Sequence, residues 1–246
     1  MTSPLITVTD LTMGWDDDNL LEQQSFEVMR GEVFAILGKS GCGKSTLLRY
    51  MTGLEQPKGG SVSIEGLGSP RLDVGRPPYG VMFQSGALFG SMSVGENLAL
   101  PLTEWTDLPA DAVSAIVRAK LRLVGLQGCE HRHPAELSGG MKKRAAIARA
   151  MTLEPSLIFL DEPSAGLDPV TAVELDELIL ALCTGLGLTV VLVTHELESI
   201  FKIATRCILL DRESKSIIAR GDPRALRDGS RRPEVHRFFN RTTEEA

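Results

Sequence analysis

The chain has 246 residues, hydrophobic residues at 43% of its positions and a formal net charge of −6. Its length suffices for one large domain with a sizeable core, and its acidic balance argues against a protein whose main ligand is nucleic acid. Residues 1–5 lack the basic start and apolar core of a signal peptide, and no apolar run approaches the roughly 18–20 residues of a membrane span. We therefore expect any function at a membrane to require partner chains.

The first motif interrupts a series of short strands that is predicted from about residue 6 to residue 64. Residues 33–37 predict a buried strand, and residues 38–45 match the phosphate-binding pattern G-x-x-x-x-G-K-[ST] at every fixed position. Glycines in this loop let successive backbone N–H groups turn toward phosphate oxygens, and the helix that begins near Lys44 adds the positive end of its dipole. A plain glycine-rich turn would not need the Lys-Ser pair at its exit.

This phosphate loop predicts ATP and Mg²⁺ as cofactors, with a role for each part. Lys44 should reach the β- and γ-phosphates, Ser45 should offer its hydroxyl to Mg²⁺, and Thr46 should bond to the α-phosphate. The backbone before Lys44 should surround the phosphates, at Gly38, Lys39, Ser40, Gly41, Cys42 and Gly43.

The four cysteines of the chain show no C-x-x-C pairing, which favours a reducing compartment. One of them, Cys42, lies inside the phosphate loop near the start of a helix. A thiol in that position is a candidate for a lowered pKa and for block by alkylation. The alternative is that Cys42 merely fills a variable position of the loop.

Two polar residues follow apolar strands further along the chain. Gln84 comes after residues 79–83 and is a candidate to sense the γ-phosphate, the metal or water from a flexible loop. His195 comes after residues 190–194 and is a candidate for contact with the γ-phosphate. A polar residue at a strand end ordinarily only marks where the strand stops and has no role in a site. These two, however, follow strands predicted to flank one nucleotide-binding edge.

A helical subdomain is predicted to be inserted between residues 87 and 153, where apolar residues recur at helical spacing. Within it, residues 137–141 read Leu-Ser-Gly-Gly-Met and precede a helix expected from about residue 141 to residue 153. Ser138 and the amides of Gly139 and Gly140 would form an anion site at the N-terminus of that helix. The basic residues 142–144 indicate the solvated face of an amphipathic helix rather than a site for nucleic acid.

Two acidic residues end a further buried strand. Residues 157–160 are apolar, and Asp161 and Glu162 follow them directly. Because the carboxyl ends of parallel strands meet at one edge of a sheet, we expect both acids at the edge that carries the phosphate loop. Asp161 should hold Mg²⁺ through water, and Glu162 should polarise the water that attacks the γ-phosphate. A lone Asp-Glu pair would favour a solvated turn, but the strand and the phosphate loop argue against that alternative.

The order and spacing of these motifs resemble the ATP-binding cassette (ABC) family over nearly the whole chain. The resemblance implies one domain over residues 1–246, with an α/β P-loop NTPase fold, an antiparallel β subdomain and an inserted α-helical signature subdomain. It assigns Gly38–Thr46 to Walker A, Gln84 to the Q-loop, Leu137–Met141 to the signature, Leu157–Glu162 to Walker B, Ser164–Asp168 to the D-loop and His195 to the H-loop switch.

The same resemblance implies a homodimer, because the signature of one chain acts on ATP held by the other. Two ATP molecules would lie between the subunits, and the absence of a tandem repeat means that the second half must come from another chain. The site residues that it implies are Glu162, His195, Gln84 and Lys44 for catalysis, Ser45, Gln84 and Asp161 for the metal, and Ser138, Gly139 and Gly140 for ATP in trans. Trp15 falls where an aromatic residue of the family stacks on adenine, with an ordinary surface or core tryptophan as the alternative.

Five further segments resemble the ATPases of MCE-type lipid transporters, the group that includes the Mla systems: residues 83–89, 97–102, 141, 142–150 and 166–171. Such ATPases act with an integral membrane permease and an MCE substrate-binding protein, and they move phospholipids or other hydrophobic molecules between membranes. In Gram-negative Mla systems a small STAS-domain protein also binds the ATPase. The resemblance thus implies a peripheral position on the cytoplasmic face of the inner membrane.

Two departures from the common cassette pattern accompany this resemblance. Met141 ends the signature where most cassettes carry Gln, and residues 66–78 are shorter and richer in Pro and Gly than the usual helix-containing linker. We expect a loop there. Neither departure affects the residues expected to bind or cleave ATP.

Two apolar elements are candidates for contacts with partners. Leu88 and Phe89 would line a groove for a helix of the permease, or else belong to the core of the helical subdomain. The tail, residues 228–246, places Val235, Phe238 and Phe239 on one face of a short helix. That face should pack on the second subunit or an accessory protein, or else fold back on its own domain.

The main rival function is a soluble ABC ATPase that acts on nucleic acid or ribosomes. Such proteins carry two cassettes in one chain or a long coiled-coil insertion, and this chain has neither. A regulatory or scaffold protein without turnover is disfavoured by Glu162 and His195.

Overall fold

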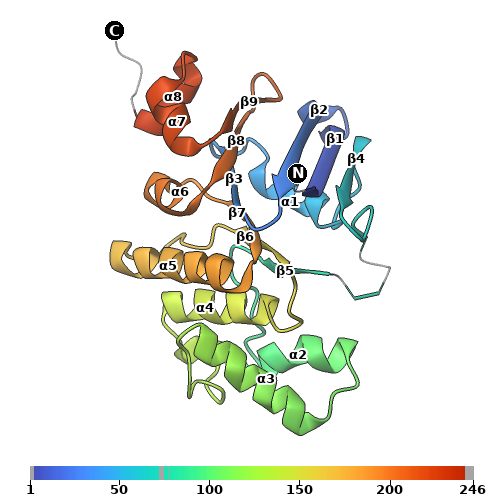
Figure 1. Cartoon of the computed structure of the whole chain (residues 1–246), viewed down its shortest axis with the longest axis vertical. Coiled ribbons are helices and arrows are strands. Elements are labelled where there is room, and N and C mark those ends of the chain that lie inside the picture. Colours follow the sequence, from blue (N-terminus) through green and yellow to red (C-terminus); the bar gives the residue numbers. More distant parts are fainter. Residues whose placement is uncertain (1–2, 72–74, 77, 242–246) are drawn as a thin grey trace. The chain divides into compact units, whose positions relative to one another are not determined.

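The computed structural model (Figure 1) describes residues 3–71, 75–76 and 78–241. Its chain divides into two compact units. Unit 1 comprises Met1–Gly75 and Thr189–Ala246 and contains most of the strands. Unit 2 comprises Arg76–Leu188 and is mainly helical. The phosphate loop and His195 therefore belong to unit 1, whereas Gln84, the signature and the two acids belong to unit 2.

An antiparallel sheet in unit 1 consists of β1 (Pro4–Trp15), β2 (Asp18–Met29) and β4 (Gly59–Ile64). β1 lies in the middle and pairs with both neighbours. β1 and β2 have 12 residues each, so they are longer than the short strands expected from the sequence. Register shifts within their ladder let the pairing continue where the alternation of buried and exposed residues slips.

The phosphate loop follows β3 (Val33–Gly38), a strand with parallel neighbours in unit 1. β3 pairs in parallel with β7 (Thr189–Val193) and with β8 (Arg206–Asp211), and β9 (Ser216–Gly221) pairs antiparallel with β8. Every residue of β3 and β7 is buried, as their continuous apolar runs predict. Ile36 lies opposite Val193, so the phosphate loop and His195 follow neighbouring strands at the same edge.

The tail of the chain forms α8 (Pro233–Asn240), which follows α7 (Pro223–Gly229) in the red part of Figure 1. α8 contacts α7 and buries Val235 and Phe239, and the ring centroid of Phe239 lies 6.0 Å from that of Phe201 in α6 (Leu197–Ile203). This packing corresponds to the alternative in which the tail folds on its own unit. Its role in assembly stays a prediction, and residues 242–246 lie outside the described residues.

We expect Phe239→Ala to lower the free energy of unfolding by roughly 3 kcal/mol, because it opens a cavity under α8. Phe238→Ala should cost less, since that ring is only half-buried. Thermal unfolding of both variants checks this expectation. Equal unfolding temperatures for the Phe239→Ala variant and the unsubstituted chain would contradict it.

Unit 2 combines two strands with a helical core. β5 (Tyr79–Met82) and β6 (Leu157–Asp161) pair in parallel, and α2 (Val94–Trp105), α3 (Ala110–Leu123) and α4 (Gly139–Ala150) share one hydrophobic cluster. The apolar residues that predict helices between residues 87 and 153 belong to this cluster or pack against it. α4 starts two residues earlier than expected because the side chain of Ser138 caps it.

A short 3-10 helix and one long α-helix complete unit 2. η1 (Pro134–Glu136) leads into the signature, and α5 (Pro169–Leu186) follows the D-loop. None of the helices in the described parts of the chain is both long and apolar enough to cross a membrane. The described part of the segment 66–78 is irregular, as expected, and residues 72–74 and 77 lie outside the described residues.

Candidate active site

The phosphate loop joins the end of β3 to α1 (Lys44–Met51) and requires glycine at two positions. A Cβ atom at Gly38, whose φ is 150°, would lie 2.4 Å from Cys42 Sγ and 2.8 Å from the carbonyl oxygen of Leu210. Gly43 caps α1 in the left-handed region, with φ 97°. Gly43 has no side chain to cap the helix, and the first turn of α1 carries no acidic residue. The N–H groups at this helix end thus suit an anion from outside the helix.

Lys44 is buried at the base of this loop. Its Nζ donates hydrogen bonds to the carbonyl oxygens of Gly38, at 3.0 Å, and Lys39, at 3.2 Å. The ammonium is thus held by the loop itself, at the end of α1 where its dipole is positive. Ser45 and Thr46 lie in the same first turn, Ser45 exposed and Thr46 half-buried. The exposed part of the loop includes Lys39, Ser40 and Gly41.

Cys42 differs from the sequence expectation of a lowered pKa. Its side chain is buried under the loop, and burial raises the pKa of the thiol despite the nearby Lys44. Burial also raises the pKa of Cys183 to about 11 and of Cys207 to about 12. The four cysteines are all free and buried, so the structure favours the interpretation that Cys42 fills space in the loop.

Trp15 ends β1 and is 51% exposed, which excludes the core alternative. The hydroxyl of Tyr50, in α1, donates to the carbonyl oxygen of Gly14, the residue before Trp15, at 3.2 Å. This bond ties the strand end that carries Trp15 to the helix that follows the phosphate loop.

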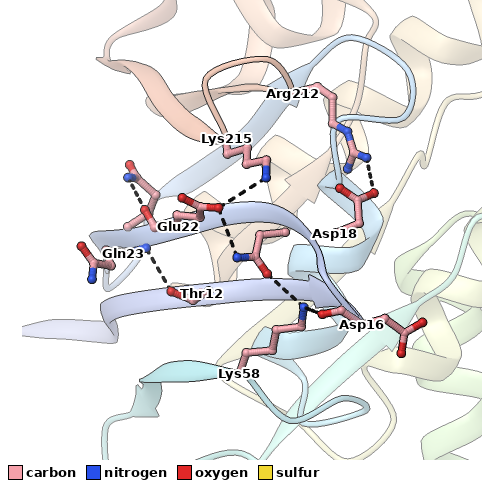
Figure 2. A network of polar contacts seen from close by, with 10 residues as sticks. Thr12, Asp16, Asp18, Glu22, Gln23, Lys58, Arg212 and Lys215 are labelled. Carbon is pink, nitrogen blue, oxygen red and sulfur yellow. Dashed lines mark hydrogen bonds and ion pairs between the residues drawn. The ribbon is translucent and has the colours of Figure 1, made fainter.

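The turn after Trp15 is also fixed by charged side chains (Figure 2). Lys58 donates to the carbonyl oxygen of Asp16 and to Asn19 Oδ1, and Arg212 pairs with Asp18 at 2.5 Å. Lys58 and Arg212 thus hold the turn at Asp16, Asp18 and Asn19, and the turn presents Trp15 to solvent instead of burying it.

His195 lies two residues beyond β7, and its side chain is 57% exposed. Its Nε2 lies 3.4 Å from a carboxylate oxygen of Glu196. The preceding Thr194 is buried, so the chain is fixed just before the exposed ring. The structure thus presents the imidazole at the edge that carries the phosphate loop.

In unit 2, the pairing of β5 with β6 brings three predicted residues to one edge. Met82 lies opposite Leu160, so Gln84 and the Asp161–Glu162 pair follow neighbouring strand ends. Both acids are buried, whereas Gln84 is exposed. Glu162 has a φ of 50°, a left-handed conformation that is uncommon outside glycine and that clusters at functional sites.

The signature lies at the start of α4. Ser138 accepts a hydrogen bond from the backbone N–H of Met141 at 3.3 Å, so its own O–H can donate to a phosphate oxygen. Gly139 is exposed, whereas Gly140 is packed so closely on α5 that a Cβ atom would lie 2.3 Å from Thr171 Cγ2. Glycine at position 140 therefore permits the contact between α4 and α5.

Lys143 is the functional candidate that the sequence interpretation missed. The expectation of a solvated face over residues 142–144 is wrong for Lys143, which is buried. Its Nζ donates to the carbonyl oxygens of Gln84, at 2.6 Å, and Glu162, at 3.1 Å. Helical spacing could have revealed it, since Lys143 shares one face of α4 with the buried Gly140 and Ile147.

Comparisons with known proteins identify the family of the chain. Residues 21–165 match the family model described as "ABC transporter". The ATP-binding protein MlaF of the Escherichia coli (strain K12) intermembrane phospholipid transport system is 40% identical over 96% of this chain and 88% of its own length. A probable ribonucleotide transport ATP-binding protein, mkl of Mycobacterium leprae, is 39% identical over 96% of this chain and 68% of its own length.

A solved dimer of the ATP-binding cassette MJ0796, in a post-hydrolysis state bound to ADP and Pi, is similar in fold. It matches with a TM-score of 0.77 and 27% identity over 88% of this chain and 98% of its own. The expected fold class is thus confirmed, and with it the family that the motifs resemble. The chain belongs to the ABC transporter family, as one of its ATPase subunits.

Proposed function

We propose that this chain hydrolyses ATP with Mg²⁺ in a homodimer and thereby drives an MCE/Mla-type transporter of phospholipids. The observation that carries the substrate class is its 40% identity to MlaF over 96% of the chain. The proposed assembly comprises an integral membrane permease, an MCE substrate-binding protein and a small STAS-domain protein. In that assembly the chain lies on the cytoplasmic face of the inner membrane, held there by the permease.

The residues present suit Mg²⁺, because Ser45, Gln84 and Asp161 offer only oxygen ligands. Mg²⁺ is bound in proteins through few side-chain oxygens together with phosphates and water. Among the described residues no group of three or more His, Cys, Asp and Glu side chains could hold a metal on its own. The ion, when bound, would neutralise charge on the phosphates.

The mechanism assigns each residue a task in binding or water activation. Lys44 and the loop amides hold the phosphates, Trp15 stacks on adenine, and His195 contacts the γ-phosphate. Glu162 orients and polarises the attacking water, with Gln84 beside it. Ser138 and the amides of Gly139 and Gly140 bind the γ-phosphate of ATP held by the second subunit, so hydrolysis requires a closed dimer.

The permease is proposed to contact the segment that follows Gln84, residues 85–89. Within this segment Leu88 packs on the helical core, whereas Phe89 is 51% exposed. The buried side chain of Asn97 fixes Phe89 by accepting from its N–H, at 2.8 Å, and donating to its carbonyl oxygen, at 3.1 Å. Phe89 is thus presented to solvent by a rigid backbone, which suits contact with a helix of the permease.

We expect Phe89→Glu to release the chain from its permease and to abolish transport, while the ATPase activity of the isolated chain stays within about twofold. Co-purification with the detergent-solubilised permease measures the first effect. Leu186→Glu is the matched control, since Leu186 is similarly exposed, at the end of α5. Retention of the permease by Phe89→Glu would contradict this contact.

The substrate class can be tested on the complex that co-purifies with the chain. In nanodiscs, ATP hydrolysis should rise when phospholipid is supplied and should not respond to added ribonucleotides. The opposite response would favour the transport activity named for the mycobacterial relative. Hydrolysis that responds only to RNA or ribosomes, without a membrane partner, would overturn the proposal.

A further inference from the structure

Lys143 joins three parts of unit 2 through one side chain. It lies on α4, five residues after the serine of the signature, and its Nζ bonds to the backbone carbonyl oxygens of Gln84 and Glu162. These two residues follow β5 and β6, which are neighbours. The ammonium therefore bridges the two strand ends that carry the proposed water-activating residues.

The bond to Glu162 acts on an unusual backbone conformation. Glu162 has a φ of 50°, which a residue with a side chain adopts only when its surroundings hold it there. Its carbonyl oxygen accepts from Lys143 Nζ at 3.1 Å and from the N–H of Ala165 at 3.3 Å. Since the backbone conformation of Glu162 sets the direction of its side chain, Lys143 helps to aim the carboxylate.

The charge of Lys143 is matched to this position. Burial lowers the pKa of Lys143, and the carboxylates of Glu162 and Asp161 oppose that shift. A buried ammonium is costly unless it is both hydrogen-bonded and near negative charge, and here both conditions are met. Removal of the charge would leave one buried carbonyl oxygen, that of Glu162, and one part-buried carbonyl oxygen, that of Gln84, with one donor fewer.

A second basic residue of α4 extends the same connection along the segment after Gln84. Arg149 donates to the carbonyl oxygens of Gly86, at 3.1 Å, and Ala87, at 2.7 Å, and Ala87 also has a left-handed backbone, with φ 48°. α4 thus holds the backbone of residues 84–87 at three carbonyl oxygens. The flexible loop expected here from the sequence is instead bonded to the helix that begins with the signature.

We propose that Lys143 is a positioning residue that holds Gln84 and Glu162 in register with the signature helix. When Ser138 engages ATP on the second subunit, the same helix sets the backbones of both residues for water activation. This inference rests on the proposed function, because it assumes that Glu162 polarises the water. It adds a residue that does not itself touch ATP.

The test compares kcat and ATP affinity in the full-length chain for four variants. Lys143→Met keeps an unbranched apolar stem, one atom shorter than the lysine side chain, but has no donor. It should lower kcat about 10- to 100-fold with unchanged ATP affinity, as expected of a misplaced catalytic group. Lys143→Arg keeps donors for both carbonyls and should stay within about threefold. Lys142→Met and Arg144→Met, on either side, should also stay within about threefold.

A double-substitution cycle separates positioning from general destabilisation. In the Glu162→Gln background, Lys143→Met should cause less than a 10-fold further loss, because the lysine can then act only through the position of Gln84. A further loss of 10-fold or more there, or an unchanged kcat for Lys143→Met alone, would overturn the inference. If Glu162→Gln itself retains activity, the proposed function fails instead, so the two failures are distinguishable.

Thermal unfolding shows whether each variant is folded at the assay temperature. If Lys143→Met is not folded, the comparison moves to Lys143→Gln, whose amide nitrogen ends one bond short of the position of Nζ. That amide should hold only one carbonyl, so kcat should fall below that of Lys143→Arg at equal ATP affinity. Equal kcat values for these two folded variants would overturn the inference.

Discussion

Glu162→Gln is expected to lower the rate of ATP hydrolysis by orders of magnitude while ATP binding survives. The substitution keeps the size of the side chain but removes the carboxylate proposed to polarise water. Because binding and dimer closure do not depend on that charge, an ATP-bound dimer should accumulate. Steady-state hydrolysis, ATP affinity and the mass of the particle in ATP measure the three effects.

Two variants serve as controls for Glu162→Gln. Glu104→Gln, at an exposed position of α2, should hydrolyse ATP at the unsubstituted rate. Lys44→Ala should instead weaken nucleotide binding, because the ammonium proposed to bind the phosphates is lost. A normal rate for Glu162→Gln would show that another group activates the water.

Mixed dimers of Ser138→Arg and Lys44→Ala chains are expected to recover activity that neither homodimer has. If the signature acts in trans, one site of the mixed dimer carries both defects and the other carries neither. Isolated mixed dimers should therefore hydrolyse ATP at up to about half of the unsubstituted rate. Full activity of the Ser138→Arg homodimer would show that the signature does not contact ATP in this way.

The residues of the candidate site that the sequence predicted are those in patterns of fixed spacing. Gly38 and Gly43 are required by local backbone geometry, and a strand-loop-helix context makes that requirement visible in the sequence. Asp161 and Glu162 could be placed because a short apolar run ends in them. The family fold follows from the same patterns, and the comparisons confirm it.

The residues that the sequence did not predict depend on contacts between segments far apart in the chain. Lys143 stands in a run of basic residues that indicates a solvated face, yet strand ends 59 and 19 residues away cover it. Whether Leu88 and Phe89 are buried or exposed likewise depends on contacts with the helical core and with Asn97, and no local pattern in the sequence reveals these contacts. The sequence also left open where the tail packs, because its apolar face alone does not specify its partner.

The most direct measurement is ATP-dependent transfer of a fluorescent phospholipid by the complex of this chain with its permease and MCE protein, reconstituted in vesicles. With the unsubstituted chain and ATP, phospholipid should move between membranes. With Glu162→Gln, which binds ATP without cleaving it, transfer should stop. Transfer at the same rate with Glu162→Gln, or without ATP, would contradict the account that hydrolysis at this site drives lipid transport.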